Sequence, residues 1–138
     1  MIAGIESKIM SAVKAAIPDI ARAASLPDPD LALTGVPPQG DVVIAMASLD
    51  MGEFNAINMR RAPAYPVWII RLRLRDMRPA DQVTAGAYGK LEAVLQNVHG
   101  LEIDPSTYVY LREVKLSGYG DGIYVYDVKC SCTVMMFN

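Results

Sequence analysis

The chain has 138 residues and a mass of 15.0 kDa, enough for one domain with a single hydrophobic core. Hydrophobic residues make up 52% and charged residues 20%, a composition that excludes intrinsic disorder. Thirteen Lys and Arg against fifteen Asp and Glu give a net charge of −2, so the chain has neither the basic excess of a strong nucleic-acid binder nor an acidic excess.

The same counts argue against catalysis and metal binding. One histidine and two cysteines offer little for a hydrolytic triad or a four-ligand zinc site. We therefore predict no enzyme activity, no cofactor and no metal. No run reaches the roughly 18 apolar residues of a membrane span, and the start lacks a signal-peptide pattern, so we expect a soluble protein of a reducing cytoplasm with no membrane partner.

The first third of the chain alternates helical and loop patterns. Residues 2 to 17 repeat apolar side chains at steps of three and four, which predicts an amphipathic helix. Pro18 interrupts this helix, and we expect a short second helical piece over 19 to 24. Residues 25 to 40 hold four prolines and two glycines, which predicts a crossover loop within one domain.

Two strands follow, joined by a long connection. Val42–Ala47 is predicted as the first strand and Tyr65–Asp76 as the second. The second alternates, with Trp68, Ile70, Leu72 and Leu74 on one face and Ile69, Arg71, Arg73 and Arg75 on the other. The connection 48–64 exceeds an ordinary hairpin loop, and we predict that it is an interaction arm.

The last half predicts a helix and a hairpin. Residues 79 to 98 regain helical spacing, and 107–116 and 123–137 read as strands joined by a glycine-rich turn at 117–122. The predicted fold is a single α+β domain over 1–138. It has an antiparallel or mixed sheet of about four strands with two main helices packed on one face.

Several conspicuous residues have structural explanations. Cys130 and Cys132 fall on one strand face, where free cysteines behave as small buried hydrophobes. His99 follows the last turn of the second helix, a capping position that requires no catalytic role. The segment 118–122 lacks the Lys-Ser/Thr of a phosphate-binding loop and is interpreted as a turn. The tyrosines of the last hairpin suit cross-strand pairs.

Two features point instead to partners. Arginines concentrate within nineteen residues, where a wet sheet face, another subunit's carboxylates and passing DNA all remain open as explanations. We select five of them as candidate subunit-contacting, partner-contacting or channel-facing residues: Arg60, Arg61, Arg71, Arg73 and Arg75. Apolar side chains in the long connection form a candidate docking loop, since exposed groups of this kind are commonly buried on a partner. These are Met51, Phe54, Ile57 and Met59.

The order of these elements resembles that of tail terminator, or tail completion, proteins of long-tailed bacteriophages. The matching features are the helix 2–17, the prolines of the crossover, the strand pair with its long loop, the helix around 88–95 and the final tyrosine-rich hairpin. The likeness covers nearly the whole chain and is one of architecture.

That resemblance implies a structural virion protein without catalytic residues. It implies a homo-oligomeric ring, commonly a hexamer, that caps the tail tube, stops its polymerisation and meets the head or neck connector. Further implied contacts are the sheath protein and transient, nonspecific passage of DNA. The expected location is the tail or neck of the virion, after assembly in the host cytoplasm. The alternatives are another small neck or head-completion protein, or a small α+β ligand-binding module.

Overall fold

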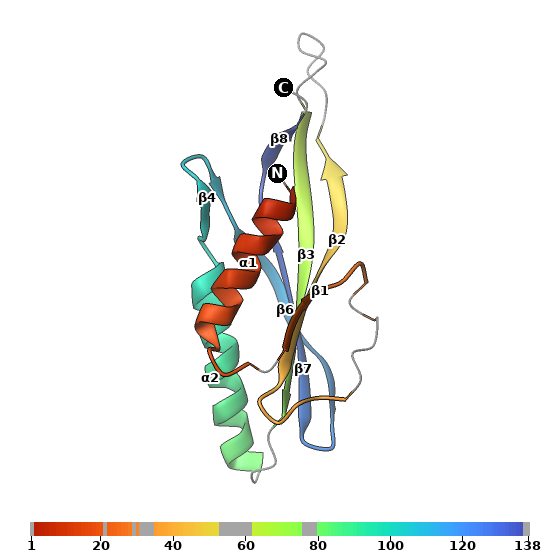
Figure 1. Ribbon diagram of the computed structural model, residues 1–138, viewed down its shortest axis with the longest axis vertical. Helices are drawn as coiled ribbons and strands as arrows, with labels where there is room; N and C mark the ends of the chain where they lie inside the picture. Colours follow the sequence, from red (N-terminus) through yellow and green to blue (C-terminus); the bar gives the residue numbers. More distant parts are fainter. Residues whose placement is uncertain are drawn as a thin grey trace.

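The computed structural model describes residues 2–20, 22–28, 30, 35–52, 62–75 and 80–136. Two helices lie against one face of a mixed six-stranded sheet, which gives the α+β class predicted from the sequence (Figure 1). The helices are α1 (Ile2–Ala16) and α2 (Ala80–Val98), and they contact each other as well as the sheet.

The sheet is built around one long strand. Strand β3 (Ala62–Arg75) pairs with β2 (Asp41–Met51) on one side. On its other side it pairs first with β8 (Val134–Met136) and then with β7 (Ile123–Ser131). The edges are β1 (Arg22–Ser25), which is parallel to β2, and β6 (Tyr110–Gly120), which is antiparallel to β7. A separate hairpin joins β4 (Glu102–Asp104) to β5 (Thr107–Tyr108).

The core fills the space between the helices and the sheet. Trp68, Ile70, Leu72 and Leu74 of β3 are buried there, so the predicted alternation of this strand is confirmed. Helix α1 contributes Ile5, Ile9 and Val13, one per turn, and α2 contributes Val94 and Val98. Burial of each of these side chains stabilises the fold by about 1.5–3 kcal/mol. Because helices of this kind must present an apolar stripe to the core, the spacing of apolar residues was enough to predict both of them.

The turn between β6 and β7 confirms the glycine-rich hairpin. Asp121 has φ 52° and Gly122 has φ 74°, the left-handed pair that matches the twist of two antiparallel strands. The rings of Tyr119 and Tyr124 contact each other next to this turn, with centroids 4.8 Å apart and planes tilted by 46°. One of the expected cross-strand aromatic pairs is therefore present.

Several boundaries differ from the sequence expectations. The sheet has six strands where about four were predicted. The expected strand 107–116 begins as β5, which pairs with β4, and the expected turn 117–122 is shorter, because β6 continues to Gly120. The predicted helical piece over 19–24 is wrong, because Arg22–Ser25 form strand β1 along β2. The predicted connection 48–64 is too long, because β2 continues to Met51 and β3 already begins at Ala62. The expected strand 123–137 is two strands, β7 and β8, that pair with successive parts of β3. In each of the last three cases pairing with a distant strand overrides the local pattern.

Candidate assembly surfaces

The face of the sheet opposite the helices, here called the outer face, is rich in charge. Strand register places Asp41 opposite Arg73, and Asp127 opposite Arg71. Such directly opposed pairs of opposite charge stabilise neighbouring strands. The arginine stripe predicted on β3 therefore meets carboxylates from the strands on both sides of it.

Asp41 is the centre of a buried ion cluster. It is 0% exposed, and its Oδ1 accepts a hydrogen bond from Arg73 Nε at 2.7 Å. Its Oδ2 accepts from Arg22 Nη2 at 2.7 Å and also from Arg73 Nη2. The carbonyl of Gly35 accepts from both arginines, at 2.7 and 3.1 Å. The cluster ties β1, β2, β3 and the crossover to one another.

Arg71 forms a second cluster beside the first. Its Nε and Nη2 donate to the two carboxylate oxygens of Asp127 at 2.8 and 2.9 Å, and its Nη1 donates to Asp30 at 2.7 Å. The hydrogen bond to Asp127 is the main reason why the pKa of Arg71 lies above its ordinary value. Burial alone would raise the pKa of Asp127, but hydrogen bonds from Arg71 and Ser117 outweigh it, so that pKa is lowered.

Replacing Asp127 with Asn is expected to cost about 2–3 kcal/mol of unfolding free energy at pH 7, because it breaks a bidentate, largely buried ion pair. The folded-state pKa of Asp127 is lowered, so its contribution is present above the ordinary carboxyl pKa and disappears as pH falls through the folded-state value. The difference between wild type and variant should therefore shrink from pH 7 to pH 3. Urea unfolding of both proteins at pH 7 and at pH 3 measures this difference in stability. A difference that stays constant between the two pH values would contradict the prediction.

The two clusters account for two of the five arginines selected from the sequence. Arg71 and Arg73 are held by carboxylates of their own chain, and Arg75 is exposed at the end of β3. Arg60 and Arg61 lie outside the described residues, so their role stays a prediction. Sequence reasoning missed Asp41 and Asp127, since only the pairing register places them opposite the arginines.

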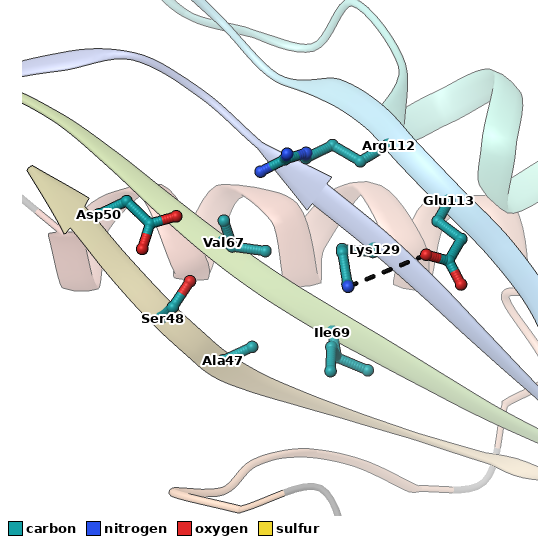
Figure 2. A pocket seen from close by; sticks show the side chains of 8 residues that line it. All are labelled: Ala47, Ser48, Asp50, Val67, Ile69, Arg112, Glu113 and Lys129. Atoms are coloured by element: carbon teal, nitrogen blue, oxygen red, sulfur yellow. Dashed lines mark ion pairs between the residues drawn. The ribbon is translucent and has the colours of Figure 1, made fainter. Parts of the chain in front are cut away.

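A shallow hollow of about 360 Å³ crosses the outer face beside the clusters (Figure 2). Its apolar floor comes from Ala47 of β2 and from Val67 and Ile69 of β3. The rest of its lining is polar and carries both signs of charge: Ser48, Asp50, Arg112, Glu113 and Lys129. Lys129 Nζ lies 3.9 Å from Glu113 Oε2. With two acids and two bases, the hollow suits polar contact with a protein surface better than contact with a phosphate backbone.

A second surface, here called the β6 patch, is apolar. Leu116 is 54% exposed, Tyr119 68% and Val114 38%, and all three project from the edge strand β6 on the helix side of the sheet, where their cross-strand partners join or pack against the core. Tyr88 of α2 is 56% exposed and lies near Tyr126, the partner of Leu116. Exposed apolar side chains gathered in this way are typical of protein interfaces. From the sequence, exposed apolar groups of this kind were predicted only in the long connection.

The predicted docking loop is described only in part. Met51 is 45% exposed at the end of β2, so one of its four apolar side chains is at the surface. Phe54, Ile57 and Met59 lie outside the described residues, and their docking role stays a prediction.

His99 directly follows α2 and the two cysteines are buried, as the sequence predicts. His99 Nδ1 accepts a hydrogen bond from the Leu111 backbone N–H at 3.2 Å, which joins the end of α2 to β6. Cys130 and Cys132 are free and buried. Over the described ranges, no group of three or more His, Cys, Asp or Glu is placed to hold a metal ion. Within the same ranges, neither helix has the length and apolar character needed to cross a bilayer.

Both cysteine thiols are expected to resist modification in the folded protein. Burial and the neighbouring Cys132 raise the pKa of the Cys130 thiol to about 12, and burial with the Asp104 charge raises that of Cys132 to about 11. Because the thiolate is the reactive form, a thiol reagent such as DTNB at pH 8 should titrate neither group in native protein and both in urea. Rapid reaction of native protein would contradict the buried placement.

Comparisons with known proteins bear on the fold. No family model matches the chain, and no curated protein matches it. Among solved structures, it is similar to a chain of the virion of a native gene transfer agent particle, with a TM-score of 0.57 and 13% sequence identity. The match covers 95% of this chain and 94% of that chain. At this identity the likeness establishes a shared fold over almost the full length of both chains.

Proposed function

We propose that this protein is a structural component of a phage-like virion, and within it a tail terminator. The observation that carries the proposal is the full-length fold likeness to a chain of a gene transfer agent virion. The order of elements that resembles tail terminators supports the same assignment. So does the surface, which offers apolar and mixed-charge areas suited to other proteins.

The proposed mechanism is capping. Copies of the protein form a closed ring, commonly of six, that sits on the last ring of the tail tube. The ring complements the tube end on one face but does not present that end again on the other, so further tube protein has nowhere to add. A heterologous interface that closes on itself gives finite assembly of this kind.

The other proposed partners follow from this place in the particle. The free face of the ring meets the head or neck connector, and the sheath protein is a further neighbour where the tail has one. DNA crosses the ring during delivery. Since the net charge is −2 and the main outer-face arginines already hold carboxylates, contact with DNA is expected to be transient and nonspecific.

The test is a tube-length assay. Purified tail tube protein is polymerised with increasing amounts of this protein, and tube lengths and ends are recorded by negative-stain electron microscopy. We expect shorter tubes with a ring of extra density at one end, and free rings with a central hole in the protein alone. An unrelated 15-kDa protein is the control. Unchanged lengths and bare ends, with tube protein that assembles normally, would overturn the terminator role.

The alternative of a ligand-binding module requires a pocket between sheet and helices. The centre of that space is filled by core residues such as Ile9, Trp68 and Val94, each 0% exposed, and a hollow between α1 and β1 lies at the edge of the sheet. No observation on the described residues favours this alternative over the structural role.

A further inference from the structure

The sheet has two open edges that run in opposite directions. Over the part of the chain that the structure describes, β6 pairs only with β7 and β1 only with β2. Strand β1 is parallel to β2, and each further step from β2 to β3, β7 and β6 is antiparallel. Strands β1 and β6 therefore run antiparallel to each other. Copies related by rotation about an axis along the strands would bring one chain's β6 beside the next chain's β1 in antiparallel orientation.

The β6 patch gives the first edge an apolar surface. Its three strand residues, Val114, Leu116 and Tyr119, lie at the β6 edge of the sheet on the side that carries the core. Burying them on another surface would favour association, because apolar area would be removed from water. Natural edge strands are normally short, whereas β6 runs from Tyr110 to Gly120 and exposes Leu116 and Tyr119 on the side that carries the core, which favours a partner over this edge.

The opposite edge carries a hollow on the same helix side. It measures about 290 Å³ and lies between α1 and β1. Its lining is formed by Ala3, Glu6, Ser7, Met10, Ala23 and Ser25. Ser25 Oγ donates to Glu6 Oε2 at 2.6 Å and holds that carboxylate at the rim. We call this the α1–β1 hollow.

The charged side chains of β6 lie on the outer face, away from the α1–β1 hollow. Arg112 and Glu113 line the outer-face hollow, and Lys115 lies opposite Asp127. In a joint between β6 and β1 they would lie on the same face as Arg22, whose positive charge is taken up by Asp41. On the helix side the two edges would meet through the apolar side chains of the β6 patch and the small side chains Ala3, Ala23 and Ser25 of the hollow.

We propose that copies of this chain join head to tail, with the β6 patch of one copy seated in the α1–β1 hollow of the next. Strands β6 and β1 then pair antiparallel across the joint, and the apolar side chains fill the hollow. A heterologous joint of this kind closes into a ring when its rotation divides the circle evenly. The inference rests on the proposed ring and names the surfaces that form it.

Cysteine cross-linking tests the joint. Leu116→Cys and Ser7→Cys variants are made singly, and each is treated with a short bismaleimide alone and as a mixture. Both sites are exposed, and the buried native cysteines serve as the unreactive background. We expect cross-linked dimers in the mixture and only monomers in each variant alone. Cross-linking of Leu116→Cys to itself, or rings that never cross-link in the mixture, would overturn the head-to-tail joint.

A charged side chain in the patch gives a second test. Leu116→Asp should leave folding intact, because the residue is exposed, and should raise the concentration for half-maximal ring assembly by at least about tenfold. Met135→Asp is the matched control, since it places the same charge on an exposed apolar site of β8 outside the patch, and it should assemble like wild type. Equal assembly by Leu116→Asp and wild type would overturn the proposal.

The two proposals fail in different ways. Rings that form and cross-link as expected but leave tube length unchanged would keep the joint and reject the terminator role. Rings that cap tubes but do not cross-link in the mixture would keep the terminator role and reject the joint. A protein that stays monomeric at every concentration and on tube ends would reject both, and analytical ultracentrifugation with and without tubes separates these outcomes.

Discussion

Replacing Arg73 with Met is expected to lower the free energy of unfolding by about 2–4 kcal/mol. Asp41 is fully buried, and the change leaves its carboxylate with Arg22 as its remaining ion-pair partner. Removing one member of a buried ion pair typically costs about 3–5 kcal/mol, because the other charge stays out of water without compensation. The remaining bond from Arg22, which is partly exposed, lowers the cost here.

The control is the next arginine on the same strand face. Arg75 is exposed, so Arg75→Met should change stability by less than about 0.5 kcal/mol. Both variants can be followed in urea by the fluorescence of Trp68, the single tryptophan, which is buried in the core. Equal stability of the two variants would mean that the Asp41 cluster does not stabilise the fold.

A double variant tests whether the loss of stability comes from the uncompensated charge of Asp41. Adding Asp41→Leu to Arg73→Met removes the uncompensated carboxylate and should recover part of the lost stability, as seen when buried ion pairs are replaced by apolar residues. A double variant less stable than Arg73→Met alone would show that the carboxylate contributes through Arg22 and not mainly through Arg73.

Replacing Gly40 with Ala is also expected to cost about 2–4 kcal/mol. Gly40 has φ 84°, a left-handed conformation that an L side chain adopts at a cost of about 1–2 kcal/mol. A Cβ there would lie 2.5 Å from the backbone carbonyl oxygen of Arg73, which cannot move without shifting β3. Such overpacking adds about 1–3 kcal/mol.

Substitutions at two other glycines separate the conformational cost at Gly40 from the cost of the close contact. Gly100 has φ 79° but nothing within 4 Å of its Cβ position, so Gly100→Ala should show the conformational cost alone, about 1 kcal/mol. Gly89 lies in α2 with open space around it, and Gly89→Ala should stabilise by about 0.5–1 kcal/mol. Thermal or urea unfolding ranks the three. A Gly40→Ala variant as stable as Gly100→Ala would mean that the close approach is relieved without cost.

The arginine stripe marks the limit of what the sequence could predict about the candidate surfaces. Alternation along β3 correctly put Arg71 and Arg73 on the face opposite Trp68, because a period of two is a local property of the strand. Their partners, Asp127 and Asp41, are 56 and 32 positions away. A local sequence pattern covers only a few neighbouring residues and cannot reveal partners so far away in the chain. Arginines with and without a carboxylate partner therefore look alike in the sequence.

The exposed apolar surfaces could not be predicted from local sequence patterns either. The exposure of Leu116 and Tyr119 depends on β6 being an edge strand of the sheet. A central strand with the same residues would bury them. Likewise the α1–β1 hollow exists because Arg22–Ser25 pair with β2, although this short segment reads as helix by itself.

Local sequence patterns were enough to predict the α+β class, the two helices, the β6–β7 hairpin and the buried face of β3. Each of these follows from periodicity or turn chemistry within a short window, where a few apolar contacts or a positive φ dominate the free energy. The strand order, the ends of β2 and β3, the two ion clusters and the open edges of the sheet became apparent only in the folded chain. Those depend on pairing between residues far apart in the chain, whose register is selected by the packing of the whole sheet.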